Sequence, residues 1–148
     1  SGGVVIAEGG SSPEVGLDAA EGYNIYINGG VVVALGGSVA QTSSSSKQAS
    51  VAVTVSSNTD LALFNGSSAL MSYKVPSGKS SGLMLSCPSL KSGSSYTVKS
   101  GVTISGGTDF YGLSTDAGVS GGSGSATVTA AASVGSSMGG GMGGPGGR

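Results

Sequence analysis

The residues of this sequence best suited to metal chemistry are acidic side chains in its N-terminal part. Glu14, Asp18 and Glu21 lie close together along the chain, and Asn24 and Asn28 follow with amide oxygens. Calcium takes roughly six to eight oxygen ligands from carboxylates, amides and carbonyls. We therefore expect Glu14, Asp18 and Glu21 to be candidate Ca²⁺ ligands. The alternative is that they are solvated turn residues, with Asp18 favouring a tight corner.

A second candidate chemistry is sugar binding, which usually combines an exposed aromatic ring with nearby hydrogen-bonding groups. Tyr23 and Tyr111 lie in glycine-rich segments, so we expect both rings to be exposed. Asn24 and Asn28 add polar groups near Tyr23, and the four residues are our candidate carbohydrate-binding set. The alternative is that the aromatic residues only fill the core. Because the sequence has no Trp, any stacking platform must be built from Tyr or Phe.

The sequence offers few of the residues that catalysis requires. The sequence has no His, which excludes a Ser-His-Asp or Cys-His arrangement within the chain. A glycosidase needs two carboxyl groups held about 5–9.5 Å apart, and the acidic cluster offers these only by proximity in sequence. The single cysteine, Cys87, cannot form an intramolecular disulfide, and we expect it to be a buried, inert thiol. We predict that the protein is not an enzyme.

Composition limits the elements that can position these residues. The 148 residues include 30 Gly and few charged side chains, but 37% are hydrophobic, in short runs rich in Val, Ile and Leu. Glycine disfavours helices and punctuates strands and turns, so we predict an all-β protein. The net charge of −1 gives no reason to expect a nucleic-acid partner. No apolar run approaches the roughly 18 residues of a membrane span.

An internal repeat organises the first third of the chain. Residues 2–10 (GGVVIAEGG) return as residues 29–37 (GGVVVALGG), 27 residues later, with seven of nine positions identical. β-Branched residues between glycine corners at such a period are typical of a stacked β-solenoid coil. Residues 24–28 and 51–55 also have strand composition. We therefore predict parallel β-helix coils over residues 1–56.

The spacing of the apolar segments changes after residue 56. Short strands follow at residues 61–64, 69–75, 82–87, 95–99, 102–104 and 125–130, and Asn65-Gly66 is a strong hairpin signal. This spacing predicts a small antiparallel, sandwich-like β-region over residues 57–134. Residues 135–148, rich in Gly and Met, have no means of building a core and are predicted to form a tail.

Several of these segments resemble a family of secreted bacterial carbohydrate-binding-domain-containing proteins. The family repeats a coil pattern like DA-x-G-x-IYI-x-GG, which here reads Asp18-Ala19, Gly22, Ile25-Tyr26-Ile27 and Gly29-Gly30 with one extra residue before the Ile-Tyr-Ile core. Residues 71–98 resemble the family's C-terminal β-rich region, and the final Gly-Met-Gly-Gly-Pro-Gly-Gly-Arg resembles its tails.

The resemblance implies a right-handed parallel β-helix that binds acidic plant polysaccharide or cellulose outside the cell or at the bacterial cell surface, with calcium held among the coils. Asp18 matches the family's coil motif and is therefore the first candidate Ca²⁺ ligand. Because the chain begins Ser1-Gly2-Gly3 rather than with Met, we expect it to be a mature or excised portion.

The first strand of the predicted coils has no partner on one side within this chain. Unpaired edge strands recruit other chains, so Val4, Val5 and Ile6 are candidate assembly residues. Two functions of different classes follow. The first is non-catalytic polysaccharide binding, assisted by calcium. The alternative is a structural subunit of an extracellular fibre that self-associates through the open coil end and the tail.

Overall fold

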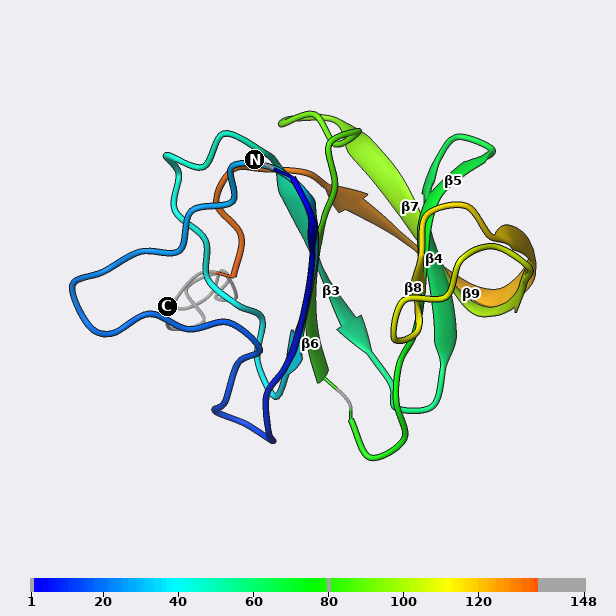
Figure 1. The fold of residues 1–148 in the computed structure, drawn as a ribbon, viewed down its shortest axis with the longest axis horizontal. Helices are drawn as coiled ribbons and strands as arrows, with labels where there is room; N and C mark the ends of the chain where they lie inside the picture. The colour runs from blue at the N-terminus through cyan, green and yellow to red at the C-terminus, as the bar shows by residue number, and fades with distance from the viewer. Residues whose placement is uncertain (1, 80, 136–148) are drawn as a thin grey trace, which may run out of the picture.

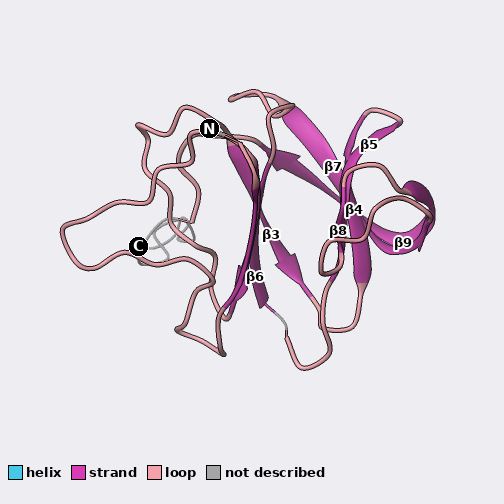
Figure 2. Cartoon of the chain, viewed as in Figure 1, coloured by secondary structure: helices cyan, strands magenta, loops and turns pink. Residues whose placement is uncertain are grey.

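The computed structural model describes residues 2–79 and 81–135, and within them the chain is all-β. The strands form two sheets that face each other (Figures 1 and 2). In the described part of the chain, no helix is both long and apolar enough to span a membrane. The strands are β1 (Val4–Glu8), β2 (Val31–Gly36), β3 (Ser50–Val55), β4 (Asp60–Asn65), β5 (Ser68–Lys74), β6 (Ser81–Ser86), β7 (Ser95–Ser105), β8 (Leu113–Ser114) and β9 (Gly118–Thr129).

The first sheet has the strand order β1-β2-β6-β3. β1 and β2 are parallel, and Val4 lies opposite Val31, so the 27-residue repeat of the sequence is also the register of this pair. β6 lies between β2 and β3 and is antiparallel to both. The sheet is therefore mixed, and the described residues do not show a parallel β-helix. The predicted strand at residues 24–28 forms only an isolated bridge from Ile25 to Thr42.

The second sheet has the order β8-β5-β4-β7-β9, with every neighbouring pair antiparallel. β4 and β5 form the hairpin that Asn65-Gly66 predicted, with Gly66 at a φ of 61° in its turn. The predicted strands at 95–99 and 102–104 are one long strand, β7, interrupted by a bulge between Ser100 and Val102. This bulge and the glycines of β9 let the β7–β9 ribbon curl away from the sandwich (Figure 1).

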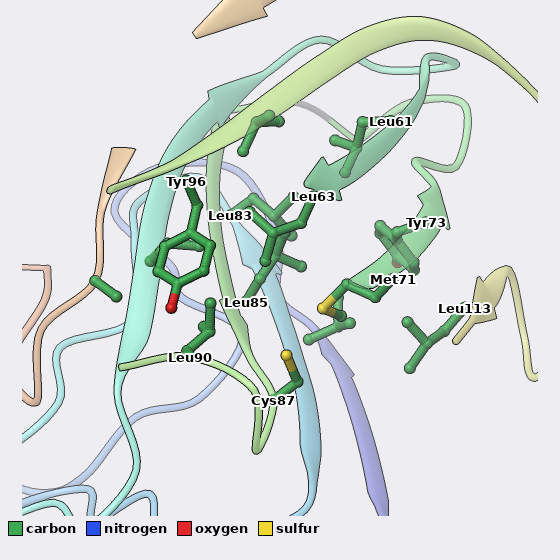
Figure 3. Close-up of a cluster of buried hydrophobic side chains, with 14 of the residues drawn as sticks. Leu61, Leu63, Met71, Tyr73, Leu83, Leu85, Cys87, Leu90, Tyr96 and Leu113 are labelled. Carbon is green, nitrogen blue, oxygen red and sulfur yellow. The ribbon is translucent and has the colours of Figure 1, made fainter. Parts of the chain in front are cut away.

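The main core fills the space between the two sheets. Leu83 and Leu85 of β6 point toward Leu61 and Leu63 of β4, and Tyr96 closes one side (Figure 3). The four leucines are at most 1% exposed. Alternate residues of each strand face this core because successive side chains of a strand point to opposite faces.

The outer face of the first sheet is also buried. Val32, Ala34 and Met84 pack there against Ile27 and Ala40, which belong to the loops covering the sheet. Burial on both faces explains why β2 and β6 read as continuous apolar runs rather than as alternating strands. The predicted boundary at residue 56 falls between β3 and β4, which belong to different sheets, and β6 then returns to the first sheet.

Candidate functional site

A groove of about 610 Å³ opens where the edge strand β1 meets the loop before β8. Val4, Val5, Ile6 and Glu8 line it from β1, and Phe110 and Tyr111 line it from the loop. A smaller hollow of about 200 Å³ shares Val4 and Phe110 with the groove. Both lie along the same open side of the sandwich, since β1 and β8 are edge strands of their sheets.

A tight turn holds the two aromatic rings of the groove. The backbone of Phe110 and Leu113 exchanges two hydrogen bonds, at 2.8 and 3.0 Å, across Tyr111 and Gly112. Both central residues have positive φ, 50° for Tyr111 and 88° for Gly112, as a type I′ turn requires. The turn therefore carries Tyr111 at its tip, where the side chain is 83% exposed. Phe110 packs edge-to-face on Tyr111, with ring centroids 5.3 Å apart.

Asp116 fixes the loop that leads into this turn. Its carboxylate accepts hydrogen bonds from the Thr108 amide (2.7 Å), the Thr108 hydroxyl (3.0 Å) and the Ser114 hydroxyl (2.9 Å). These bonds, first of all the one from the Thr108 amide, lower the pKa of the Asp116 carboxyl, because they favour its charged form. Asp116 also lines the smaller hollow, which therefore has an ionised carboxylate beside the Phe110 ring.

Glu8 places a carboxylate in the groove itself, near a tyrosine of the core. Tyr73 is fully buried, and its hydroxyl has no hydrogen-bond partner among the described residues. Burial first of all, and then the nearby negatively charged Glu8 side chain, raise the pKa of Tyr73 to about 12. The phenol therefore stays protonated at neutral pH. Glu8 is the acidic residue that lines the groove, Asp116 is the one that lines the adjoining hollow, and no Lys or Arg of the described residues lines either of them.

The predicted carbohydrate-binding residues do not come together. Tyr23 and Tyr111 are both exposed, as predicted, at 77% and 83%. However, Tyr23, Asn24 and Asn28 belong to the loop outside the first sheet, and none of them lines the groove of Tyr111. In Figure 1 that loop (blue) lies far to one side of the view from β8. Asn28 has a structural contact, since its side-chain oxygen accepts a hydrogen bond from the Lys47 amide at 3.0 Å.

The predicted calcium ligands Glu14, Asp18 and Glu21 are all exposed. Asp18 accepts a hydrogen bond from the next amide, that of Ala19, at 2.9 Å. Within residues 2–79 and 81–135, no three His, Cys, Asp or Glu side chains gather in a way that could hold a metal ion. Calcium binding by these residues therefore stays a prediction.

The predicted assembly residues lie on the unpaired edge of the first sheet. Val4 is 41% and Val5 is 46% exposed, whereas Ile6 is partly buried against the core. The carbohydrate-binding set predicted from the sequence included neither Phe110 nor Glu8. The sequence signal for Phe110 was the Tyr111-Gly112 pair that follows it. This pair favours a turn with positive φ, which places the adjacent Phe110 ring at the surface. Cys87 is buried, as predicted, and burial raises the pKa of its thiol.

Comparisons of the chain with protein-family models, with curated proteins and with solved structures found no match. The family resemblance seen in the sequence therefore stays a prediction, and the functional argument depends on the groove itself.

Proposed function

We propose that this chain is a non-catalytic polysaccharide-binding module that acts outside the cell or at the bacterial cell surface. The observation that supports this most is the exposure of Tyr111 at the tip of a type I′ turn, beside a groove with an apolar floor. A bulky residue with positive φ is costly, by about 1–2 kcal/mol. Such strain is concentrated at functional sites, which supports a role for the exposed ring.

The groove offers the two kinds of contact that a sugar ring needs. The apolar face of a pyranose would lie on the Tyr111 ring. The Phe110 ring packs perpendicular to the Tyr111 ring and supports its orientation. The Glu8 carboxylate would accept hydrogen bonds from sugar hydroxyls in the same groove, and Asp116 would do so in the adjoining hollow. Charge-assisted bonds of this kind are stronger than neutral ones.

The charge of the groove favours one of the two ligand classes that the sequence predicts. Glu8 and Asp116 would repel the carboxylates of an acidic polysaccharide, and no basic side chain lines either hollow. A neutral glucan such as cellulose carries no such penalty. We therefore propose cellulose-like chains as the ligand of this groove. An acidic polysaccharide would need a cation to bridge its carboxylates to those of the protein. The predicted Ca²⁺ could serve as this cation.

Retention on insoluble cellulose and on pectin tests the proposal. Tyr111→Asn removes the ring and keeps a residue that tolerates positive φ. We expect it to weaken cellulose binding about five- to tenfold, the value of one lost aromatic contact. Tyr26→Asn is the matched control, because Tyr26 is also exposed (52%) but lies on the loop outside the first sheet. Tyr23→Asn tests the other predicted ring.

The outcomes separate the sites. Loss of binding in Tyr111→Asn alone supports the groove. Equal retention of all three variants and the unmodified protein, or no retention at all, contradicts the proposal. Loss only in Tyr23→Asn would move the site to the loop. Pectin retention that a chelator abolishes, with cellulose retention unchanged, would assign calcium to the acidic ligand alone.

A further inference from the structure

β1 is the least protected sheet edge in the described part of the chain. β8 is only two residues long, and β3 is partly covered by the bridge between Ser50 and Ala131. β9 is twisted by its glycines and faces a bulge in β7. Short, covered and bulged edges are the usual protections against strand pairing. β1 has none of these, and its two exposed valines add apolar surface to it.

The hydrogen bonds of β1 show which of its backbone groups have no partner among residues 2–79 and 81–135. Gly3 accepts a bond from the Val31 amide at 2.9 Å, and Gly9 donates one to the Leu35 carbonyl at 2.7 Å. Alternate residues of a strand point their N–H and C=O groups to the same neighbour. The odd-numbered residues of β1 therefore bond to β2, and Val4, Ile6 and Glu8 direct their N–H and C=O groups away from the sheet.

The partner that this edge fits is a strand of the same sequence. β2 is identical to β1 at three of the five paired positions, and the two pair in register over all five residues of β1. The chain thus contains one example of this sequence pairing with its near-copy. We propose that the free edge of β1 pairs with β1 of a second copy, which extends the first sheet across a twofold axis.

Symmetry sets the direction of this pairing. In a parallel ladder, bonding residues of one strand lie opposite non-bonding residues of the other, as Val4 opposite Val31 illustrates. Two identical parallel edges would therefore need an odd register shift, which a twofold axis cannot produce. An antiparallel pair centred on Ile6 meets the requirement. Ile6 then lies opposite Ile6 of the second copy, and each outward N–H finds a carbonyl.

Charge agrees with this arrangement. Glu8 is the only charged residue of β1. A parallel in-register pair would place the two Glu8 side chains opposite each other, which is destabilising. In the antiparallel pair each Glu8 instead lies opposite Val4 of the other copy, and the two carboxylates lie at opposite ends of the interface.

Two substitutions at one position test the register. Val4 is exposed, so Val4→Lys and Val4→Glu should both fold. Across the proposed interface, Lys at position 4 faces Glu8 of the other copy, and Glu at position 4 repels it. We expect the dimer dissociation constant, measured by sedimentation, to differ between the variants by roughly tenfold or more, with Val4→Lys the tighter. Raising the salt concentration should reduce this difference.

Amide hydrogen exchange distinguishes strand pairing from a dimer held by side chains alone. Only strand pairing places the Ile6 amide in a new hydrogen bond. In the monomer the Ile6 amide is directed away from β2 and should exchange fast, whereas the Ala7 amide, directed to β2, should be protected. On dimerisation the Ile6 amide should become protected as protein concentration rises.

Three results would overturn the proposal. They are a monomer at all concentrations, equal weakening by both substitutions at Val4, and a dimer in which the Ile6 amide still exchanges as in the monomer. Open-ended fibres would also overturn it, because a twofold interface closes on itself. They would support the head-to-tail assembly that the sequence predicted, for which the tail residues 136–148 lie outside the described part of the chain.

Discussion

The core contains two buried tyrosines whose hydroxyl groups differ in hydrogen bonding. This difference predicts that replacement by phenylalanine changes the free energy of unfolding in opposite directions at the two positions. Tyr73 is fully buried, and its hydroxyl has no hydrogen-bond partner among the described residues. Tyr96 is 4% exposed, and its hydroxyl accepts a bond from the Lys91 amide at 2.9 Å. That hydroxyl also lies 3.4 Å from the Ser89 carbonyl, to which it donates.

Replacing each tyrosine with phenylalanine removes only the hydroxyl. A buried polar group without a partner costs about 1–3 kcal/mol, whereas a hydrogen bond that is made contributes about 1 kcal/mol. We therefore expect Tyr73→Phe to raise the free energy of unfolding by about 1 kcal/mol and Tyr96→Phe to lower it by about 1–2 kcal/mol. Urea denaturation at neutral pH, with the m-value checked for constancy, measures both.

The same hydroxyl predicts a dependence of stability on alkaline pH. Burial, followed by the charge of Glu8, raises the pKa of Tyr73 from 10.0 to about 12 in the folded protein. Between these values the unfolded chain loses the phenolic proton and the folded protein keeps it, so stability falls as pH rises. The contribution lost over this window is about 3 kcal/mol. It should be absent from Tyr73→Phe and present in Tyr96→Phe.

One result would refute this reasoning. If Tyr73→Phe loses as much stability as Tyr96→Phe, the Tyr73 hydroxyl has a partner in solution. Glu8 is the candidate, since its charge already influences this phenol. Glu8→Gln would then change the alkaline titration of Tyr73, followed by tyrosinate absorbance.

Three further predictions concern a loop beside the first sheet, strand β6 and the candidate site. A Cβ at Gly16 would lie 2.6 Å from the Ala7 carbonyl and 2.7 Å from the Leu35 amide, so Gly16→Ala should cost about 2 kcal/mol or more in urea denaturation. The buried Ser86 hydroxyl accepts a hydrogen bond from the Gln48 side-chain Nε2 at 2.8 Å and donates one to the Ala49 carbonyl at 2.7 Å, so Ser86→Ala should cost about 1–3 kcal/mol by the same assay. The lowered pKa of Asp116 means that its contribution to stability is present at neutral pH and is lost as pH falls through its folded-state pKa. An NMR titration should show the Thr108 amide shifting with that transition, and Asp116→Asn should abolish the shift.

The parts of the fold that could be predicted are those that local sequence determines. The repeat gave the register of β1 on β2, because two strands of one sequence between glycine corners stack most simply in phase. Asn65-Gly66 predicted the β4–β5 hairpin, because the turn needs a residue that accepts positive φ. The exposure of Tyr111 followed from the glycine beside it.

The remaining features depend on contacts between segments far apart in sequence. β6 lies between β2 and β3, and nothing within residues 81–86 distinguishes a strand buried in a mixed sheet from one in a hairpin. Residues 24–28 have strand composition, but Ile27 packs on the outer face of the first sheet and the segment acts as a covering loop. Glu8 and Phe110 share a groove only because two sheet edges meet there.

The two proposals use the same side of the sandwich, and together they predict a coupling. Val4, Ile6 and Glu8 line the groove together with Val5. As alternate residues of β1, the first three share one face of the sheet, and in an antiparallel pair opposite side chains lie on the same face. The grooves of both copies would then flank one continuous floor, with a Tyr111 tip on each side. A glucan chain that contacts both tips binds the dimer more tightly than the monomer, so soluble cello-oligosaccharide should lower the dimer dissociation constant. Sedimentation at several oligosaccharide concentrations measures this effect. In Tyr111→Asn the effect should disappear while dimerisation without sugar stays unchanged. If oligosaccharide instead dissociates the dimer, the sugar and the second copy compete for the β1 edge, and the shared floor does not exist.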